Sequence, residues 1–211
     1  REMEFNRLLS SAISVYGEPN LDGVKINSKP KETQKTINKK DYHLITNAEE
    51  IDDWIKEAEE IGEVAVDTET SSLDPHQADL IGVSLSTKIG KACYIPIGHS
   101  SKKSINKELV LKKLKPLLED SSIKKIGQNI KFDFIVLFKQ GINISSMEDT
   151  MLMSYVLDAG KNRHNMDTLS EIHLDHKTIT FKDLVGSGKK EISFSEVDVE
   201  KAKDYAAEDA D

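Results

Sequence analysis

An apolar strand that ends in two acidic residues is the feature that most limits how this chain can fold. Residues 64–69 read VAVDTE, and the two-residue repeat of a strand places Asp67 and Glu69 on one face, about 7 Å apart. Two carboxylates at that spacing repel each other unless a cation lies between or beside them. Asp-x-Glu pairs are also common on solvated surfaces. The strand alone therefore leaves two alternatives, a metal site and an exposed acidic pair.

A third acidic residue falls on the apolar face of a helix expected at residues 130–139. The apolar stripe of this helix consists of Ile130, Phe134, Leu137 and Phe138, and Asp133 lies on the same face. A buried carboxylate needs a partner, because an unpaired buried charge destabilises the fold. The helix dipole supplies about 0.3–1 kcal/mol, and an arginine or a metal can supply the rest. The alternative is a partly exposed Asp in the first helical turn.

The last expected helix, at residues 197–211, also carries an acidic residue on an apolar face. A narrow stripe of small residues runs along it: Val199, Ala202 and Ala206. Asp209 extends this stripe, and Tyr205 lies one turn earlier, so that phenol and carboxylate can point toward a common site. The neighbouring Glu208 and Asp211 fall off the stripe and are expected to be solvated.

The ligand types on these faces favour hard divalent cations. Four carboxylates without a convincing set of Cys or His residues suit Mg²⁺ or Mn²⁺ better than zinc. His173 and His176 have the spacing of half a zinc site, but no matching cysteines accompany them. A site with two such cations implies phosphoryl transfer, in which one metal generates hydroxide and the other stabilises the leaving oxygen.

From Asp41 onward, the periodicity predicts a mixed α/β domain. Strands are expected at residues 42–45, 64–69, 80–86, 92–97 and 124–127. Gly90 is expected to turn the third of these strands into the fourth as an antiparallel hairpin. Helices are expected at residues 47–60, where Asn47 and Glu50 form a capping box, and at 106–118, 130–139, 148–157, 166–173 and 197–211. This order favours one sheet with helices packed on it.

The segment before Asp41 has a different character. Residues 3–16 show helical apolar spacing, whereas residues 17–40 hold six lysines without periodicity. Such a stretch is typical of a solvated tether, and a DNA-contacting arm is the alternative. We therefore predict a helix at 1–18 from a preceding domain, a basic linker at 19–40 and a truncated domain at 41–211. Arg1 in place of a start methionine favours a piece of a longer polypeptide.

Composition excludes several classes of protein. Cys93 is the single cysteine of 211 residues, which rules out a disulfide framework and fits a reducing cytoplasm. No run of about 18 apolar residues and no signal-peptide pattern occurs, so we expect neither membrane insertion nor export. The formal net charge of −8 argues against a protein that coats nucleic acid. It is compatible with a nuclease whose acidic residues hold cations.

Three ordered motifs carry a family resemblance: Asp67-Thr68-Glu69-Thr70, Gly127-Gln128-Asn129 followed by Asp133, and Tyr205-Ala206-Ala207-Glu208-Asp209. They resemble the three exonuclease motifs of the DEDD superfamily. Further segments, at 94–96, 114–120 and 176–181, resemble the 3′-5′ proofreading exonuclease domains of bacterial family A DNA polymerases, the DNA polymerase I type. The resemblance implies an α/β, RNase H-like (DEDD exonuclease) fold, with a mixed central sheet flanked by helices.

The same resemblance implies roles for the site residues. Four carboxylates would hold two divalent ions, Mg²⁺ or Mn²⁺: Asp67, Glu69, Asp133 and Asp209. Tyr205 places the chain in the tyrosine subclass, in which the phenol helps to orient the attacking water. The other subclass has a histidine at the position that Asp204 occupies here.

Six further residues match positions that handle the DNA end in this family: Thr70, Leu73, Gln128, Asn129, Phe132 and Arg163. Leu73 would wedge against the terminal base, and Arg163 would approach a phosphate. Structural roles remain open for several of them: packing for Leu73, a helix N-cap for Asn129 and a solvated loop cation for Arg163. Phe132 replaces a tyrosine often found there, which keeps ring stacking and removes a hydroxyl contact.

These observations predict a metal-dependent exonuclease that removes nucleotides from a single-stranded or frayed DNA 3′ end. We expect a monomer that shares its polypeptide with a polymerase domain and contacts no membrane. Two alternatives stay open: a stand-alone enzyme that trims RNA 3′ ends, and an inactive domain kept in a polymerase for architecture. The glycine-rich residues 186–188, with Lys189 and Lys190, lack the spacing of a phosphate-binding loop and are expected to form a flexible basic loop.

Overall fold

The computed structural model describes residues 6–17, 42–101, 103–188 and 191–211. The chain divides into two compact units, residues 1–34 and 35–211, and each is described by itself. The first unit contributes α1 (Asn6–Tyr16), which falls where a helix was expected. The basic linker predicted at 19–40 lies outside the described residues, as do Lys189 and Lys190.

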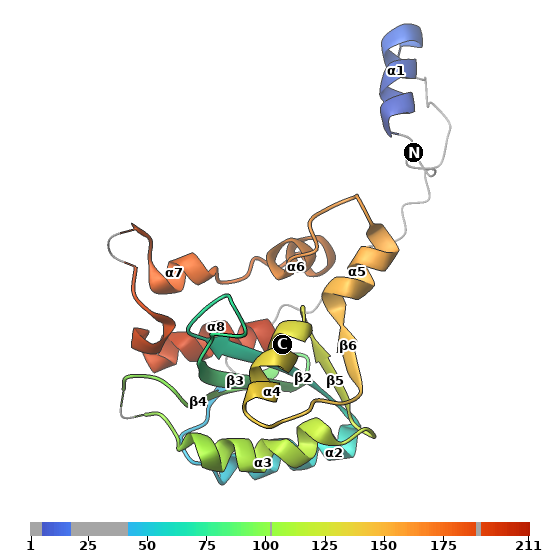
Figure 1. Cartoon of the computed structure of the whole chain (residues 1–211). Coiled ribbons are helices and arrows are strands. Elements are labelled where there is room, and N and C mark those ends of the chain that lie inside the picture. The colour runs from blue at the N-terminus through green and yellow to red at the C-terminus, as the bar shows by residue number, and fades with distance from the viewer. Residues whose placement is uncertain (1–5, 18–41, 102, 189–190) are drawn as a thin grey trace. The chain divides into compact units, whose positions relative to one another are not determined.

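A mixed sheet of six strands lies at the centre of the second unit, in the order β1-β4-β3-β2-β5-β6 (Figure 1). The strands are β1 (Tyr42–Leu44), β2 (Glu63–Thr70), β3 (Leu80–Lys88), β4 (Lys91–Pro96), β5 (Lys124–Gly127) and β6 (Met147–Asp149). β3 pairs antiparallel with both β2 and β4. The pairs β1–β4, β2–β5 and β5–β6 are parallel. The predicted mixed sheet and the hairpin at Gly90, whose φ is +79°, are confirmed.

Helices flank both faces of this sheet. They are α2 (Glu50–Ile61), α3 (Lys107–Glu119), α4 (Lys131–Lys139), α5 (Thr150–Asp158), α6 (Met166–Leu174), α7 (Phe181–Val185) and α8 (Val199–Ala210). α2, α3 and α4 bury their apolar residues in one core with β2, β3 and β4. α8 packs on the opposite face, through a second cluster that includes Tyr94, Ala202 and Ala206. The small-residue stripe predicted on the last helix is therefore buried against the sheet.

Local signals account for several helix boundaries. Glu50 Oε1 accepts the backbone N–H of Asn47 at 2.9 Å, which is half of the predicted capping box. The other half differs, because Asn47 Oδ1 accepts from Glu49 and the helix begins only at Glu50. Gly62, with φ +83°, ends α2 in the left-handed conformation that glycine adopts without strain. The Asn106 side chain caps α3 by accepting from Leu109.

Strand β2 presents different residues to the two faces of the sheet. Val64 and Val66 point into the core beneath α2 and α3. Strand alternation therefore directs Ala65, Asp67 and Glu69 toward the face that α8 covers. The valines on one face of the strand anchor it in the core. The acidic residues on its other face are therefore held toward α8.

The structure differs from the expectations at several segments. The helix predicted at 148–157 begins only at Thr150, because residues 147–149 pair with β5 as the short strand β6. The short α7 and the 3₁₀ turn Phe194–Glu196 were also not expected. Phe138 was assigned to the apolar stripe of α4, yet it is 60% exposed and stacks on Phe134.

The prediction that Glu208 and Asp211 are solvated is also wrong. Glu208 is 5% exposed, and its carboxylate accepts from His176 and from the backbone of Ile179. Asp211 accepts from the Tyr42 hydroxyl at 2.8 Å and from the backbone of Gly90 at 2.6 Å. α8 is covered on more than one side, by the sheet and by the segment that precedes α7. Its own sequence does not reveal the second covering segment.

Candidate active site

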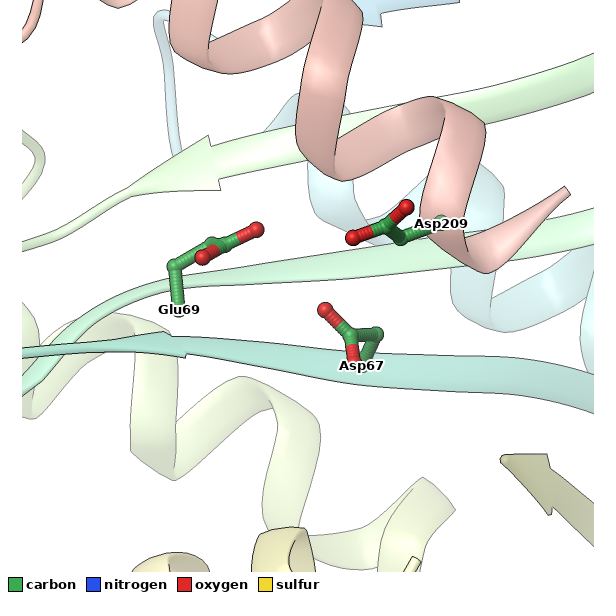
Figure 2. Close-up of side chains that lie close together, drawn as sticks. All are labelled: Asp67, Glu69 and Asp209. Atoms are coloured by element: carbon green, nitrogen blue, oxygen red, sulfur yellow. The ribbon is translucent and has the colours of Figure 1, made fainter. Parts of the chain in front are cut away.

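Three carboxylates converge where α8 crosses the acidic end of β2. Asp67 and Glu69 extend from β2 and Asp209 from α8, and they point toward one another (Figure 2). One oxygen from each lies within 4.8 Å of the others. Two residues adjacent on one strand face and one from a helix far along the chain thus meet at a single point.

Close approach and burial determine the electrostatics of this cluster, in which Glu69 is buried and Asp67 and Asp209 are partly buried. Burial raises the pKa of Asp67 to about 6. Burial raises the pKa of Glu69 well above its usual value, and the charges of Asp67, Asp209 and Asp133 raise it further. The pKa of Asp209 is likewise raised, first by burial and then by Asp67. Among the described residues, Glu69 Oε1 is buried without a hydrogen-bond partner. This orphaned acceptor and the converging oxygens fit a divalent cation.

Asp133 reaches the same region from α4 but is held differently. It is 2% exposed, and its Oδ1 accepts from the backbone N–H of Thr68 at 3.0 Å and from the Thr68 hydroxyl at 2.5 Å. The partner that this buried acid requires is therefore a neighbour of Asp67 and Glu69, not an arginine. Burial, followed by the charge of Asp67, raises the pKa of Asp133 well above its usual value.

Tyr205 lies one turn before Asp209 on α8, and its phenol hydrogen-bonds Asp209. Burial is the main cause that raises its pKa, and the charges of Asp209 and Glu69 add to the effect. The phenol therefore keeps its proton and donates. Its ring packs against Phe181 and Phe194, each with a centroid separation of 6.2 Å.

A cavity of about 930 Å³ contains these groups. The predicted site residues that line it are Asp67, Glu69, Thr70, Leu73, Gln128, Asn129, Phe132, Asp133, Tyr205 and Asp209. Leu73 is 94% exposed, so it has no packing role in the core. Arg163 is exposed in the connection between α5 and α6, outside the lining residues.

The turn that carries Gln128 and Asn129 is held from β6 and α5. Gln128 donates to the His164 carbonyl at 2.7 Å and accepts from Thr150 at 2.6 Å. Asn129 has φ +58°, and its backbone N–H donates to Asp149 at 3.1 Å. No side-chain cap bond occurs at the described start of α4, so Asn129 does not serve as its N-cap. Within the described chain, Asn129 Oδ1 is buried without a partner.

Sequence reasoning missed several residues of the cavity wall. Asn165, Met166, Phe181 and Phe194 also line the cavity. Phe181 and Phe194 are isolated aromatic residues in a stretch where no helix or strand was expected, and this is the signal that could have found them. Thr68 was quoted only as part of a motif, although it is the hydrogen-bond partner of Asp133.

Comparisons with known sequences agree with this geometry. A family model for the 3′-5′ exonuclease matches residues 42–211. DNA polymerase I of Pseudomonas aeruginosa is 39% identical over 218 residues, which cover 100% of this chain and 23% of that protein. DNA polymerase I of Rhizobium leguminosarum is 44% identical over 191 residues, which cover 81% and 19%. The chain thus spans about a fifth of the length of these relatives.

Solved structures with a similar fold include nucleases. Brucella melitensis NrnC is 28% identical with a TM-score of 0.57, over 80% of this chain and 73% of that one. A structure of NrnC with bound Mg²⁺ has a TM-score of 0.53 at 26% identity. RNase D of Escherichia coli, an exoribonuclease, has a TM-score of 0.57 at 16% identity and shows the likeness of fold alone. In the part of the chain that the structure describes, no helix is long and apolar enough to cross a membrane.

Proposed function

Because the chain belongs to the 3′-5′ exonuclease domain family of the family A DNA polymerases, we propose that it removes nucleotides from a DNA 3′ end as a proofreading activity. The observation that carries this proposal is the convergence of Asp67, Glu69 and Asp209 within 4.8 Å in a cavity that also holds Tyr205. Phosphodiester hydrolysis requires a cation site and a positioned water, and this cavity offers groups for both.

Asp67, Glu69 and Asp209 would hold divalent cations, with Asp133 at the edge of the same cluster. We propose two ions, Mg²⁺ or Mn²⁺, which would supply Lewis-acid stabilisation of the phosphate oxygens. The raised pKa values of these acids support the proposal, because burial and mutual repulsion disfavour their charged forms and a bound cation would offset both effects.

Tyr205 orients the attacking water in this proposal. Its phenol keeps its proton and is already held by Asp209, so it lies beside the cluster in a defined direction. A neutral donor and acceptor at this place can fix a water without adding charge to the site.

The cavity wall supplies groups for the terminal nucleotide. In this proposal Phe132, which lines the cavity, stacks on a base, and the exposed Leu73 separates that base from the next one. Gln128, Asn129 and Thr70 offer polar atoms, and Arg163 would approach a phosphate from outside the lining. An unpaired end fits such a site better than a duplex, which supports a single-stranded or frayed substrate.

The long relatives support a second part of the proposal. Because they are DNA polymerases of which this chain spans about a fifth, we propose that the domain acts as a monomer in one polypeptide with a polymerase domain. The convergent carboxylates argue against an inactive architectural domain. The likeness to NrnC keeps RNA ends as a competing substrate, which the experiment below includes.

The test is the polarity and substrate of cleavage. With Mg²⁺, a 5′-labelled DNA single strand should shorten stepwise from its 3′ end, faster than matched RNA, and a 3′-blocked strand should resist. Asp209→Asn should remove the activity, whereas Asp204→Asn should not, because the Asp204 side chain is 48% exposed beside Lys203. Rapid cutting of a circular single strand would overturn the exonuclease assignment, and faster trimming of RNA would overturn the DNA assignment.

A further inference from the structure

The buried carboxylate of Glu208 has both of its oxygens engaged by one short segment, residues 175–180, which we call the strap. Oε1 lies 3.0 Å from His176 Nε2, and Oε2 accepts the backbone N–H of Ile179 at 2.5 Å. Glu208 is only 5% exposed. A carboxylate buried in this way is stable only with such partners, so the two contacts are strongly favoured.

The strap joins α6 to α7 and is tied firmly to α6. The Thr178 hydroxyl donates to Asp167 at 2.7 Å. Ser170 and His176 are joined twice, by the His176 backbone N–H to the Ser170 carbonyl at 3.3 Å and by the Ser170 hydroxyl to the His176 carbonyl at 3.1 Å. These hydrogen bonds join α6 and the strap into one structural unit.

This unit continues into a wall of the cavity. Met166, at the start of α6, and Phe181, at the start of α7, both line the cavity. Apolar burial attaches the α6 part of this wall only sparsely, because Ser170 is the one buried residue of α6, whereas Val185 of α7 packs in the second cluster with α8. Where apolar packing is sparse, a few polar contacts determine the position of a segment.

Glu208 itself belongs to α8, the helix that carries Tyr205 and Asp209. Glu208, which occupies the position directly before Asp209, therefore links the strap to the helix that carries the proposed catalytic groups. We propose that Glu208 is a positioning residue: through His176 and the Ile179 amide it holds the α6–α7 wall over the cavity and so sets the affinity for the terminal nucleotide. The affinity part of this inference rests on the proposed function.

The first measurement needs no nuclease activity. In metal-free protein, His176→Ala should speed hydrogen exchange at residues 176–185 by about tenfold, the effect expected for the loss of one charge-assisted hydrogen bond, and Glu208→Ala, which loses two, should speed it more. Asp204→Asn, one turn earlier on α8, is the matched control and should leave this exchange unchanged. Because Glu208→Ala can disturb α8 itself, His176→Ala keeps the test valid with that helix intact. Unchanged exchange at residues 176–185 in His176→Ala would show that the His176–Glu208 contact does not hold the wall.

The second measurement is the affinity for a single-stranded DNA trinucleotide in Ca²⁺, determined by fluorescence anisotropy. We expect Kd to rise about tenfold in His176→Ala and at least as much in Glu208→Ala. The double variant should bind no more weakly than Glu208→Ala, because that variant already lacks the His176 contact. In Mg²⁺, KM should rise by a similar factor while kcat changes little. Faster exchange with unchanged Kd would show that the wall does not set affinity.

An effect of the Glu208 charge on Asp209 is the competing explanation, and two variants separate it. Glu208→Gln keeps an oxygen for the Ile179 N–H and should retain part of the affinity, whereas a charge effect would make Gln and Ala equivalent. His176→Ala leaves the carboxylate in place and should still weaken binding. A wild-type domain that binds the trinucleotide but does not cleave it would contradict the proposed function and leave the binding comparison decisive.

Discussion

At the scale of single residues, Asp133 and Asp209 reach the cavity under different constraints. Asp209 faces Asp67 and Glu69 directly, and the described protein offers the cluster little compensation beyond the Tyr205 phenol. Asp133 is already satisfied by the backbone and hydroxyl of Thr68. Its loss would therefore change the stability of the fold in two opposing ways. The Thr68 donors would lose their acceptor, and the other acids of the cluster would lose a charge that repels them.

Substitutions at Asp133 should separate these two effects. Asp133→Asn keeps an oxygen for Thr68 and removes one charge from the cluster, so it should stabilise the metal-free protein by on the order of 1 kcal/mol while abolishing cleavage. Asp133→Ala removes the acceptor and leaves the Thr68 N–H buried, and should destabilise by about 1–3 kcal/mol. Thermal melting in chelator measures both. An Asn variant clearly less stable than the wild type would contradict this division.

At the scale of elements, the junction of β6 with α5 supports the turn that carries Gln128 and Asn129 into the wall of the cavity. Asp149 ends β6 in register with Gly127 of β5. Its Oδ1 accepts three backbone N–H groups, from Asn129, Met151 and Leu152. One carboxylate oxygen thus caps α5 and holds the turn in which Asn129 adopts φ +58°. A three-residue strand determines where a proposed substrate-binding turn lies.

We predict that this role depends on the oxygen and not on the charge. Asp149→Ala should destabilise the domain by about 0.5–2 kcal/mol, as for other lost helix caps, and should raise KM because the Asn129 turn loses its anchor. Asp149→Asn keeps the acceptor and should resemble the wild type in both respects. Urea unfolding and steady-state kinetics test this. If Asn were as damaging as Ala, charge would be the property that matters.

At the scale of the whole molecule, the acidic cluster makes the metal-free fold sensitive to pH. The pKa of Asp67 is raised from 3.8 to about 6, so the folded state binds its proton more tightly than the unfolded state does. Stability should therefore rise as pH falls from 7 to 5, by on the order of 1 kcal/mol from this residue. Glu57 acts in the opposite direction only at lower pH, because Lys88 and Lys91 lower its pKa from 4.5 to about 2.

Urea unfolding in chelator at pH 7, 6 and 5 measures this dependence. Asp67→Asn should flatten it, because the variant has no carboxyl to titrate at that position. Added Mn²⁺ should raise the melting temperature of the wild type at pH 7 by mass action, and that of the variant much less. A wild-type stability that falls between pH 7 and pH 5 in chelator would show that the cluster is not under charge strain.

Patterns in the sequence predict the mixed α/β architecture, most element boundaries and the acidic faces of β2 and α8. These properties are local, because strand alternation, helical spacing and capping residues depend on neighbours within a few positions. The same local reasoning singled out Asp67 and Asp209 as acids on apolar faces. It failed for β6, whose three residues carry no apolar repeat and pair only because β5 lies beside them.

Which acids share a site and which are bound elsewhere depends on how distant segments pack together. Glu208 and Asp209 are adjacent in the chain, yet one is engaged by His176 and Ile179 and the other faces Asp67. Successive helical positions point about 100° apart, so neighbouring side chains meet different partners. Those partners come from segments far along the chain. The pattern of one helix shows which residues are unusual, and packing alone determines what each of them touches.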